Sequence, residues 1–212
     1  DSGERARILH YKALVLRDHG AAIDEALNLL REALEIEESN GYQQNRASTL
    51  HEMAGIYIQQ GKLEEASTLY QQVLELHELN QDDWGKAATL HQVATIAARK
   101  GNYDEALSKL EESLRIKERI GDNRGKTATL NQIAGVYVLQ GKLDEALSLF
   151  QQSLNLKEQI GDLKGQASTL NDIAGVYARQ DRLQDAYQVY MQALQISERI
   201  GLPEEKASTL HN

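Results

Sequence analysis

GDNRGKTATLNQIAGVYVLQGKLDEALSLFQQSLNLKEQI, residues 121–160, decides the fold, because residues 161–200 repeat it closely. Eighteen of the forty positions are identical between the two stretches. The same phrase recurs upstream at Leu50 and Leu90, and it begins again at Leu210. A fixed period of about 20–50 residues is typical of proteins built from stacked repeats. The sequence therefore predicts a tandem repeat array.

Within residues 121–160 the apolar side chains follow the period of an α-helix. Leu130, Ile133 and Ala134 fall at i, i+3 and i+4, and Tyr137 completes the stripe at i+7. A glycine at position 141 then interrupts the pattern, as glycines do at the ends of helices. A second stripe with helical spacing follows and consists of Leu143, Ala146, Leu147, Phe150, Ser153 and Leu154. Each repeat is thus predicted to be a hairpin of two helices of about 17 residues, called helix A and helix B.

The whole chain can be divided in this way. We expect repeats at about 1–41, 42–80, 81–120, 121–160 and 161–200, followed by the first part of a sixth helix A at 203–212. Because the chain begins at Asp1 rather than Met and ends inside a predicted helix, we expect it to be a fragment of a longer protein.

Composition limits the classes of function. The 212 residues have 41% hydrophobic and 26% charged side chains, which is enough apolar material for a packed core. The net charge is −9, and an acidic chain without a basic stripe is a poor candidate for binding nucleic acid. No apolar run approaches the roughly 18 residues needed to insert into a membrane. There is no cysteine, which fits a reducing compartment, so we expect a cytoplasmic protein.

At these positions the chain resembles the tetratricopeptide repeat (TPR) family. The family pattern has a small residue and then Tyr on helix A, followed by Ala, an aromatic residue or Leu, and a small residue on helix B. In the fourth repeat these are Ala134, Tyr137, Ala146, Phe150 and Ser153. The resemblance covers essentially the whole chain and implies an all-α fold, a right-handed α-solenoid, or superhelix, of helix-turn-helix hairpins.

The chain departs from the common family form in two respects. The usual proline at the end of helix B is replaced by glutamate, as at Glu118 and Glu158, and the period is 40 residues. The phrase TLNQIAGVY at 129–137 is similar to the long repeats of kinesin light chain and of bacterial proteins that join TPR arrays to ATPase or protease-like signalling domains. The resemblance implies a non-enzymatic scaffold that binds a protein or peptide in a groove formed by the A helices. The alternatives are a sensor array of a larger signalling protein and a cytoskeletal adaptor similar to kinesin light chain.

In this family helix A lines the concave side, so the stripe beside its core stripe is the candidate binding groove. In the fourth repeat this stripe holds Asn131, Gly135 and Val138. The Asn131 position carries a polar side chain in every repeat, a ladder of His10, His51, His91, Asn131, Asn171 and His211. These side chains could hydrogen-bond to an extended peptide, or they could bond to the neighbouring helix and specify stacking. A metal site is not expected, because adjacent helices lie roughly 8–10 Å apart, and no cofactor motif is present.

The Gly135 position is occupied by Leu14, Gly55, Thr95, Gly135 and Gly175 along the array. Glycine inside a helix costs up to about 1 kcal/mol relative to alanine. Its recurrence predicts a close approach to the backbone, either by a neighbouring helix or by a ligand. Four residues one step further around helix A are expected to set specificity, namely Gln59, Arg99, Leu139 and Arg179.

Other polar patterns have simpler interpretations. Acidic pairs such as Asp144-Glu145 open each helix B and complement the helix dipole. Asp122 and Asp162, each followed three residues later by glycine, are predicted to cap helices. His19 and His77 are expected to be isolated surface or turn residues. No nucleophile is combined with a base, so an enzyme is not expected, and the sequence does not fix the oligomeric state.

Overall fold

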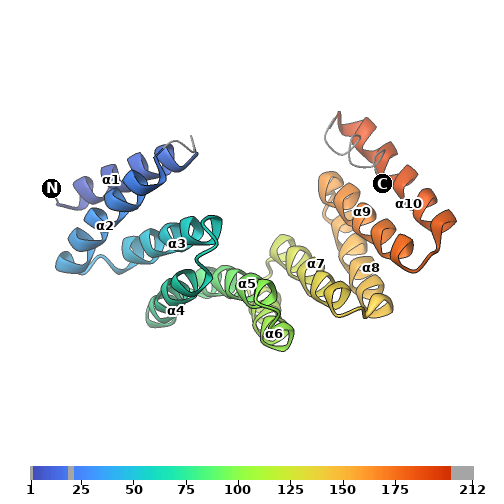
Figure 1. Ribbon diagram of the computed structural model, residues 1–212, viewed down its shortest axis with the longest axis horizontal. Coiled ribbons are helices and arrows are strands. Elements are labelled where there is room, and N and C mark those ends of the chain that lie inside the picture. The colour runs from blue at the N-terminus through green and yellow to red at the C-terminus, as the bar shows by residue number, and fades with distance from the viewer. Residues whose placement is uncertain (1, 19–21, 202–212) are drawn as a thin grey trace. The chain divides into compact units, whose positions relative to one another are not determined.

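The computed structural model describes residues 2–18 and 22–201, and within these residues every regular element is an α-helix. The helices have 17 or 18 residues each, close to the predicted length (Figure 1). In chain order they are α1 (Ser2–Asp18), α2 (Ile23–Asn40), α3 (Gln43–Gln59), α4 (Leu63–Leu79), α5 (Asp83–Arg99), α6 (Tyr103–Arg119), α7 (Asn123–Leu139), α8 (Leu143–Gln159), α9 (Leu163–Arg179) and α10 (Leu183–Ile200). The predicted sixth helix A, with His211, lies outside the described residues, as does His19.

The chain forms two compact units, residues 1–101 and 102–212. In the first unit each helix from α1 to α4 packs against the next one, and α1 also touches α3. In the second unit α6 to α10 pack in the same sequential manner (Figure 1). The all-α class built from tandem helical hairpins is thus confirmed. The boundary between the units falls after Gly101, in the turn of the predicted repeat 81–120.

The two helices of a hairpin approach each other at a pair of alanines. Ala134 on α7 and Ala146 on α8 are both 0% exposed and belong to one core cluster with Phe150. Ala54 on α3 and Ala66 on α4 make the equivalent pair in the first unit, and both are also 0% exposed. A methyl group is the smallest side chain that still buries apolar surface, so it permits close contact between the backbones.

The tyrosine three residues after the helix-A alanine is held from two sides. Its ring packs against the core cluster of its own unit, and a basic side chain from the following turn lies over its face. Lys142 Nζ lies 5.5 Å from the centroid of the Tyr137 ring, and the Arg182 guanidinium lies 4.2 Å from that of Tyr177. Such cation–π contacts favour a closed turn between helix A and helix B.

From α2 onward, every described turn between successive helices has one residue in the left-handed conformation. After α7, Gly141 has φ of +76°, the Lys142 N–H donates to Tyr137 O at 2.9 Å, and the Gly141 N–H donates to Val138 O at 3.2 Å. This pair of bonds is the Schellman motif, so the predicted glycine stop is confirmed. Two turns place another residue there, with φ of +54° at Gln81 and +60° at Asp181.

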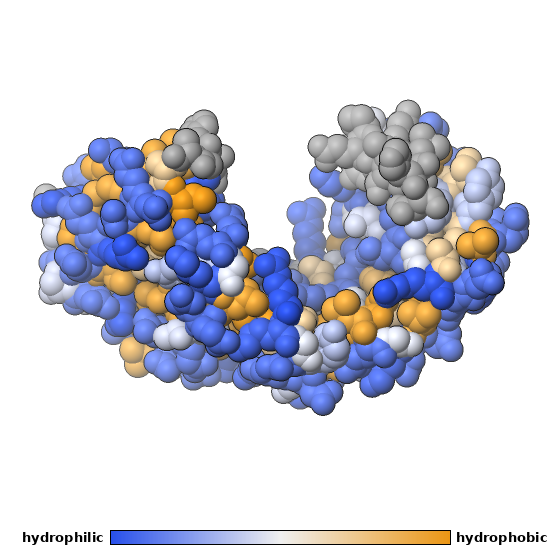
Figure 2. Space-filling view, viewed as in Figure 1, coloured by the Kyte–Doolittle hydropathy of each residue, from blue (hydrophilic) through white to orange (hydrophobic). Residues whose placement is uncertain are grey.

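Figure 2 shows hydrophilic side chains over most of the visible surface, with apolar side chains in scattered patches. One such group is a stripe on α1, where Ile8 is 50%, Tyr11 61% and Val15 56% exposed. The residue that corresponds to Val15 in the next repeat, Ile56, is 1% exposed because the preceding hairpin covers it. The outer face of the first hairpin is therefore apolar. No helix within residues 2–18 and 22–201 has the length and hydrophobicity required to cross a bilayer.

Replacing Gln81 by glycine should stabilise the first unit. A non-glycine residue in the left-handed region costs roughly 1–2 kcal/mol, and glycine removes most of that strain. We expect a free energy of unfolding higher by about 1 kcal/mol in urea titrations. The reverse change at the equivalent turn, Gly121→Gln, should lower it by a similar amount; equal stability of both variants would contradict this explanation of the turns.

Candidate functional site

The predicted groove residues lie on the first helix of each hairpin, α1, α3, α5, α7 and α9. We call these positions the helix-A strip, and each unit carries its own strip. Every ladder residue within the described part of the chain is partly buried. The same holds for Gly55, Thr95, Gly135, Gly175 and Val138, whereas the predicted specificity residues Gln59, Arg99, Leu139 and Arg179 are exposed.

The ladder side chains contact neighbouring protein groups. Asn131 Nδ2 donates to Thr169 Oγ1 of α9 at 2.9 Å, and His10 Nδ1 lies 3.0 Å from Thr49 Oγ1 of α3. The His51 ring stands edge-on to the Tyr70 ring of α4, with 5.1 Å between centroids. Of the two roles that the sequence left open, these contacts favour stacking of hairpins for His10 and Asn131, whereas the His51 contact lies within its own hairpin.

His10 and Asn131 each contact the hydroxyl of a threonine that sequence reasoning missed. Thr49, Thr129 and Thr169 are all 0% exposed, and each also bonds to the end of the preceding helix B. Lys117 Nζ donates to Thr129 Oγ1 at 2.7 Å, and Lys157 Nζ donates to Thr169 Oγ1 at 2.5 Å. The sequence signal was a threonine at one fixed offset in successive repeats, inside a helix that disfavours it.

The two lysines of these links are nearly buried, and burial lowers the pKa of both. Asp122 and Asp162 oppose the shift by favouring the charged ammonium groups. In the first repeat the position of Lys117 is occupied by Glu37, whose Oε1 accepts from the Thr49 hydroxyl at 3.0 Å. The same hairpin junction is thus held by a cation in one unit and by a carboxyl group in the other.

The strip glycines are not explained by packing of the helices. A Cβ atom placed on Gly55 or Gly135 would meet nothing within 4 Å beyond the backbone of its own helix, and one on Gly175 would meet only the Tyr190 hydroxyl at 3.9 Å. The expectation that a neighbouring helix approaches these glycines is therefore wrong. The surface over the backbone is open at all three positions.

One specificity position has a partial anchor. Arg179 donates through one guanidinium nitrogen to Val138 O of α7 at 3.2 Å and remains exposed. Its remaining N–H groups can still bind an acidic group. Leu139, 56% exposed, lies next to that carbonyl in sequence, so an apolar and a basic side chain border this part of the strip.

The aspartates before the A helices are caps, as predicted. Asp122 Oδ1 accepts from the Gly125 N–H at 2.8 Å, and Asp162 Oδ1 accepts from the Gly165 N–H at 2.9 Å. The glycine is required because a Cβ on Gly125 would lie 1.9 Å from Asp122 Oδ2.

His77 differs from its prediction as an isolated surface or turn residue. Its side chain is only 14% exposed, and Nδ1 lies 2.8 Å from Asp82 Oδ2. Asp82 in turn caps α5 by accepting from the Gly85 N–H at 2.9 Å. The acidic residues at the start of helix B were predicted to complement the helix dipole, and they also contact the following hairpin. Glu64 forms an ion pair with Lys100 at 2.8 Å, and Asp144 accepts a hydrogen bond from Gln180 at 2.8 Å.

Comparison with known proteins now identifies the family. Models described as tetratricopeptide repeat match residues 4–78, 85–159 and 166–200. The chain belongs to the tetratricopeptide repeat family. No curated protein matches it.

Solved structures show the same TPR fold. A Podosopora anserina protein named for kinesin light chain and its nearly identical TPR-like repeats is 21% identical, with a TM-score of 0.76 over 93% of this chain and 97% of that one. A signal-transduction ATPase with a TPR sensor from Pyrococcus horikoshii is 18% identical, with a TM-score of 0.80 over 97% of this chain and 31% of that one. A Rap protein complexed with Competence and Sporulation Factor is 12% identical, with a TM-score of 0.80 over 97% of this chain and 57% of that one. At these identities the likeness concerns the fold.

Acidification should destabilise the first unit through two ladder histidines. Burial lowers the pKa of His10 and His51 from the ordinary 6.5, and Glu52 only partly offsets this effect. The unfolded chain therefore takes up protons first, so their contribution to stability is complete above pH 6.5 and is lost as the pH falls towards the lowered values. We expect the melting temperature to fall between about pH 7.5 and pH 5.

The matched variant takes its residues from the second unit, where asparagine occupies the ladder. His10→Asn combined with His51→Asn should reduce the loss on acidification, measured by circular dichroism melts across the same range. An identical pH dependence in the variant and in the natural chain would show that these histidines do not cause it.

Two glycines of α7 should respond in opposite ways to alanine. Gly125→Ala displaces the Asp122 cap and should lower the free energy of unfolding by about 1 kcal/mol. Gly135→Ala adds a methyl group in open space and should raise it by up to about 1 kcal/mol, because alanine has the higher helix propensity. Chemical denaturation of the two single variants gives the answer, and a destabilised Gly135→Ala chain would contradict the open surface over α7.

Proposed function

We propose that this TPR chain is a non-enzymatic scaffold whose helix-A strips bind a segment of a protein partner. The observation that carries the proposal is the set of open glycines on α3, α7 and α9. A methyl group on Gly55 or Gly135 would touch no neighbouring element, so the fold itself does not need their small size. Each nevertheless lowers helix stability by roughly 1 kcal/mol relative to alanine.

A bare helix backbone lets a ligand approach more closely than any side chain would allow. In the second unit the strip also offers exposed Leu139 and Arg179 beside Gly135 and Gly175. This combination suits a segment with an apolar and an acidic side chain. Because His10 and Asn131 already bond to neighbouring helices, we assign them to shaping the strip.

The buried polar groups support a scaffold rather than an enzyme. His10, Thr49 and Glu37 form a hydrogen-bonded series that superficially resembles a nucleophile with its base. Thr49 is 0% exposed, and its hydroxyl lies between the other two groups. A nucleophile must reach the substrate, so this series joins three helices and performs no chemistry.

Two narrower functions would use the same surface. One is a sensor array of a larger signalling protein, and the other is a cytoskeletal adaptor. The fold shared with the Pyrococcus horikoshii sensor and with the kinesin light chain repeats is compatible with both. Co-sedimentation with microtubules separates them, because an adaptor that contacts the filament should appear in the pellet and a sensor array should stay in the supernatant.

The glycine surface can be tested with a double variant of the second unit. A partner is first recovered on the immobilised chain from an extract of the source cells and identified by mass spectrometry. Its affinity is then measured by calorimetry for the natural chain and for Gly135→Ala combined with Gly175→Ala. We expect affinity to fall at least about tenfold, or roughly 1.4 kcal/mol, while thermal stability is unchanged or higher.

Ser148→Ala is the control, because Ser148 is exposed on α8, outside the strip. It should bind like the natural chain. Binding of the double variant with unchanged affinity would remove the helix-A strip of the second unit as the binding surface.

A further inference from the structure

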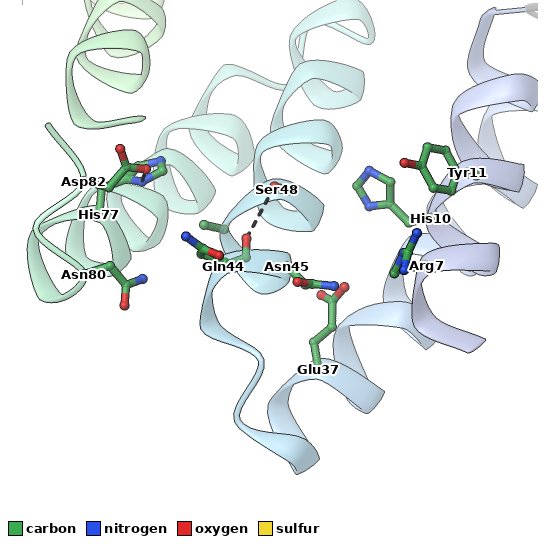
Figure 3. A pocket seen from close by; sticks show the side chains of 11 residues that line it. Arg7, His10, Tyr11, Glu37, Gln44, Asn45, Ser48, His77, Asn80 and Asp82 are labelled. Carbon is green, nitrogen blue, oxygen red and sulfur yellow. Dashed lines mark hydrogen bonds and ion pairs between the residues drawn. The ribbon is translucent and has the colours of Figure 1, made fainter. Parts of the chain in front are cut away.

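The first unit contains a polar cavity of about 440 Å³ outside the glycine surface. It opens between α1, the start of α3 and the turn that precedes α5, and Glu37 from the end of α2 reaches into it (Figure 3). Its rim carries amide and hydroxyl groups, from Gln44, Asn45, Ser48 and Asn80. Such groups can hydrogen-bond to a polar ligand in either direction.

Glu37 is the unusual member of this cavity. It is 2% exposed, and its Oε1 accepts from the Thr49 hydroxyl, whereas its Oε2 has no hydrogen-bond partner among the described residues. Thr49 has a single proton, which it donates to Glu37, so the 3.0 Å contact with His10 requires His10 Nδ1 to donate. The whole local series therefore ends on Glu37 without satisfying its second oxygen.

The other repeats show that a carboxyl group is not needed here for folding. At the equivalent position Lys117 and Lys157 donate to the threonines of the next hairpin. An aspartate lies close enough to each lysine to favour its charged form. Glu37 has no such counter-charge among the ion pairs of the described residues. A buried carboxyl group that lacks a compensating partner is costly, and that cost favours a ligand that supplies one.

Two further features indicate the charge of the ligand. Residues 1–101 contain 16 Asp and Glu against 10 Lys and Arg, so the unit attracts cations. Tyr11 lines the cavity beside His10 and is 61% exposed, which leaves its ring available to a cation (Figure 3). Arg7 also lines the cavity, but it is exposed and does not pair with Glu37 in the structure.

We infer that this cavity binds the guanidinium group of an arginine side chain, with Glu37 Oε2 accepting its N–H groups and the Tyr11 ring beside it. A guanidinium group carries five donors in a plane, which suits a carboxylate at the floor and amide oxygens at the rim. The inference rests on the proposed function only in assigning the arginine to a protein partner. The glycine surface of the second unit and this cavity would then engage different chemical groups.

N-acetyl-arginine amide is the probe, and N-acetyl-citrulline amide is its neutral counterpart of the same shape. Binding to the natural chain is followed by NMR shifts of the Asn45 and Ser48 amides. We expect saturation by the arginine probe with a Kd in the millimolar range and at least about tenfold weaker binding of the citrulline probe. Equal shifts with both probes, or none with either, would overturn the inference.

Two substitutions separate recognition from folding. Glu37→Gln should abolish the preference for arginine, and Glu37→Lys should abolish arginine binding. Position 42 holds tyrosine where Asp122 follows Lys117, so circular dichroism melts of both variants establish that each is folded before binding is compared. Glu35→Gln, an exposed neighbour on α2, should change nothing. Arginine binding that persists in Glu37→Lys would refute the site. Both Glu37 variants leave Gly135 and Gly175 intact, so partner capture by the second unit fails or succeeds independently.

Discussion

The close contact between the two helices of each hairpin determines how the remaining elements can be placed. It is made by pairs of fully buried alanines, Ala54 with Ala66 and Ala134 with Ala146. Because the contact is so short, a larger side chain at either position would separate the helices and open the turn that follows.

Successive hairpins are joined by a second, polar constraint. A buried threonine on helix A receives one side chain from the preceding helix B and, at two junctions, another from the preceding helix A. Hydrogen bonds between buried groups favour one arrangement, because a slip would leave further polar groups without partners. These junctions occupy the ladder residues and leave the glycine positions of helix A open. On helix A, the polar ladder residues therefore hold the hairpins together, and the glycine positions leave the helix backbone uncovered.

The fold could be predicted because each element depends on residues that repeat at a fixed offset. Ala134, Gly141 and Asp122 act locally, through packing, a left-handed turn and a cap, and their roles were predicted correctly. The threonine junctions were missed because the position twelve residues before the threonine holds a different residue type in different repeats, namely Glu37, His77, Lys117 and Lys157. The shared position is therefore not visible as a sequence pattern.

The environment of Gly135 could not be predicted, since a sequence does not show whether the space over a helix is filled. His77 was assigned wrongly because its contact with Asp82 depends on the conformation of the turn between the two residues, which the sequence pattern does not give.

The open backbone of the A helices has no structural purpose in the hairpins themselves, and we attribute it to a partner. The decisive experiment is a crystal structure of this chain with a bound partner segment. We expect partner atoms in van der Waals contact with the backbone of Gly135 and Gly175, with the threonine junctions unchanged. A partner seated on the B helices, with the glycines of α7 and α9 still uncovered, would contradict this view.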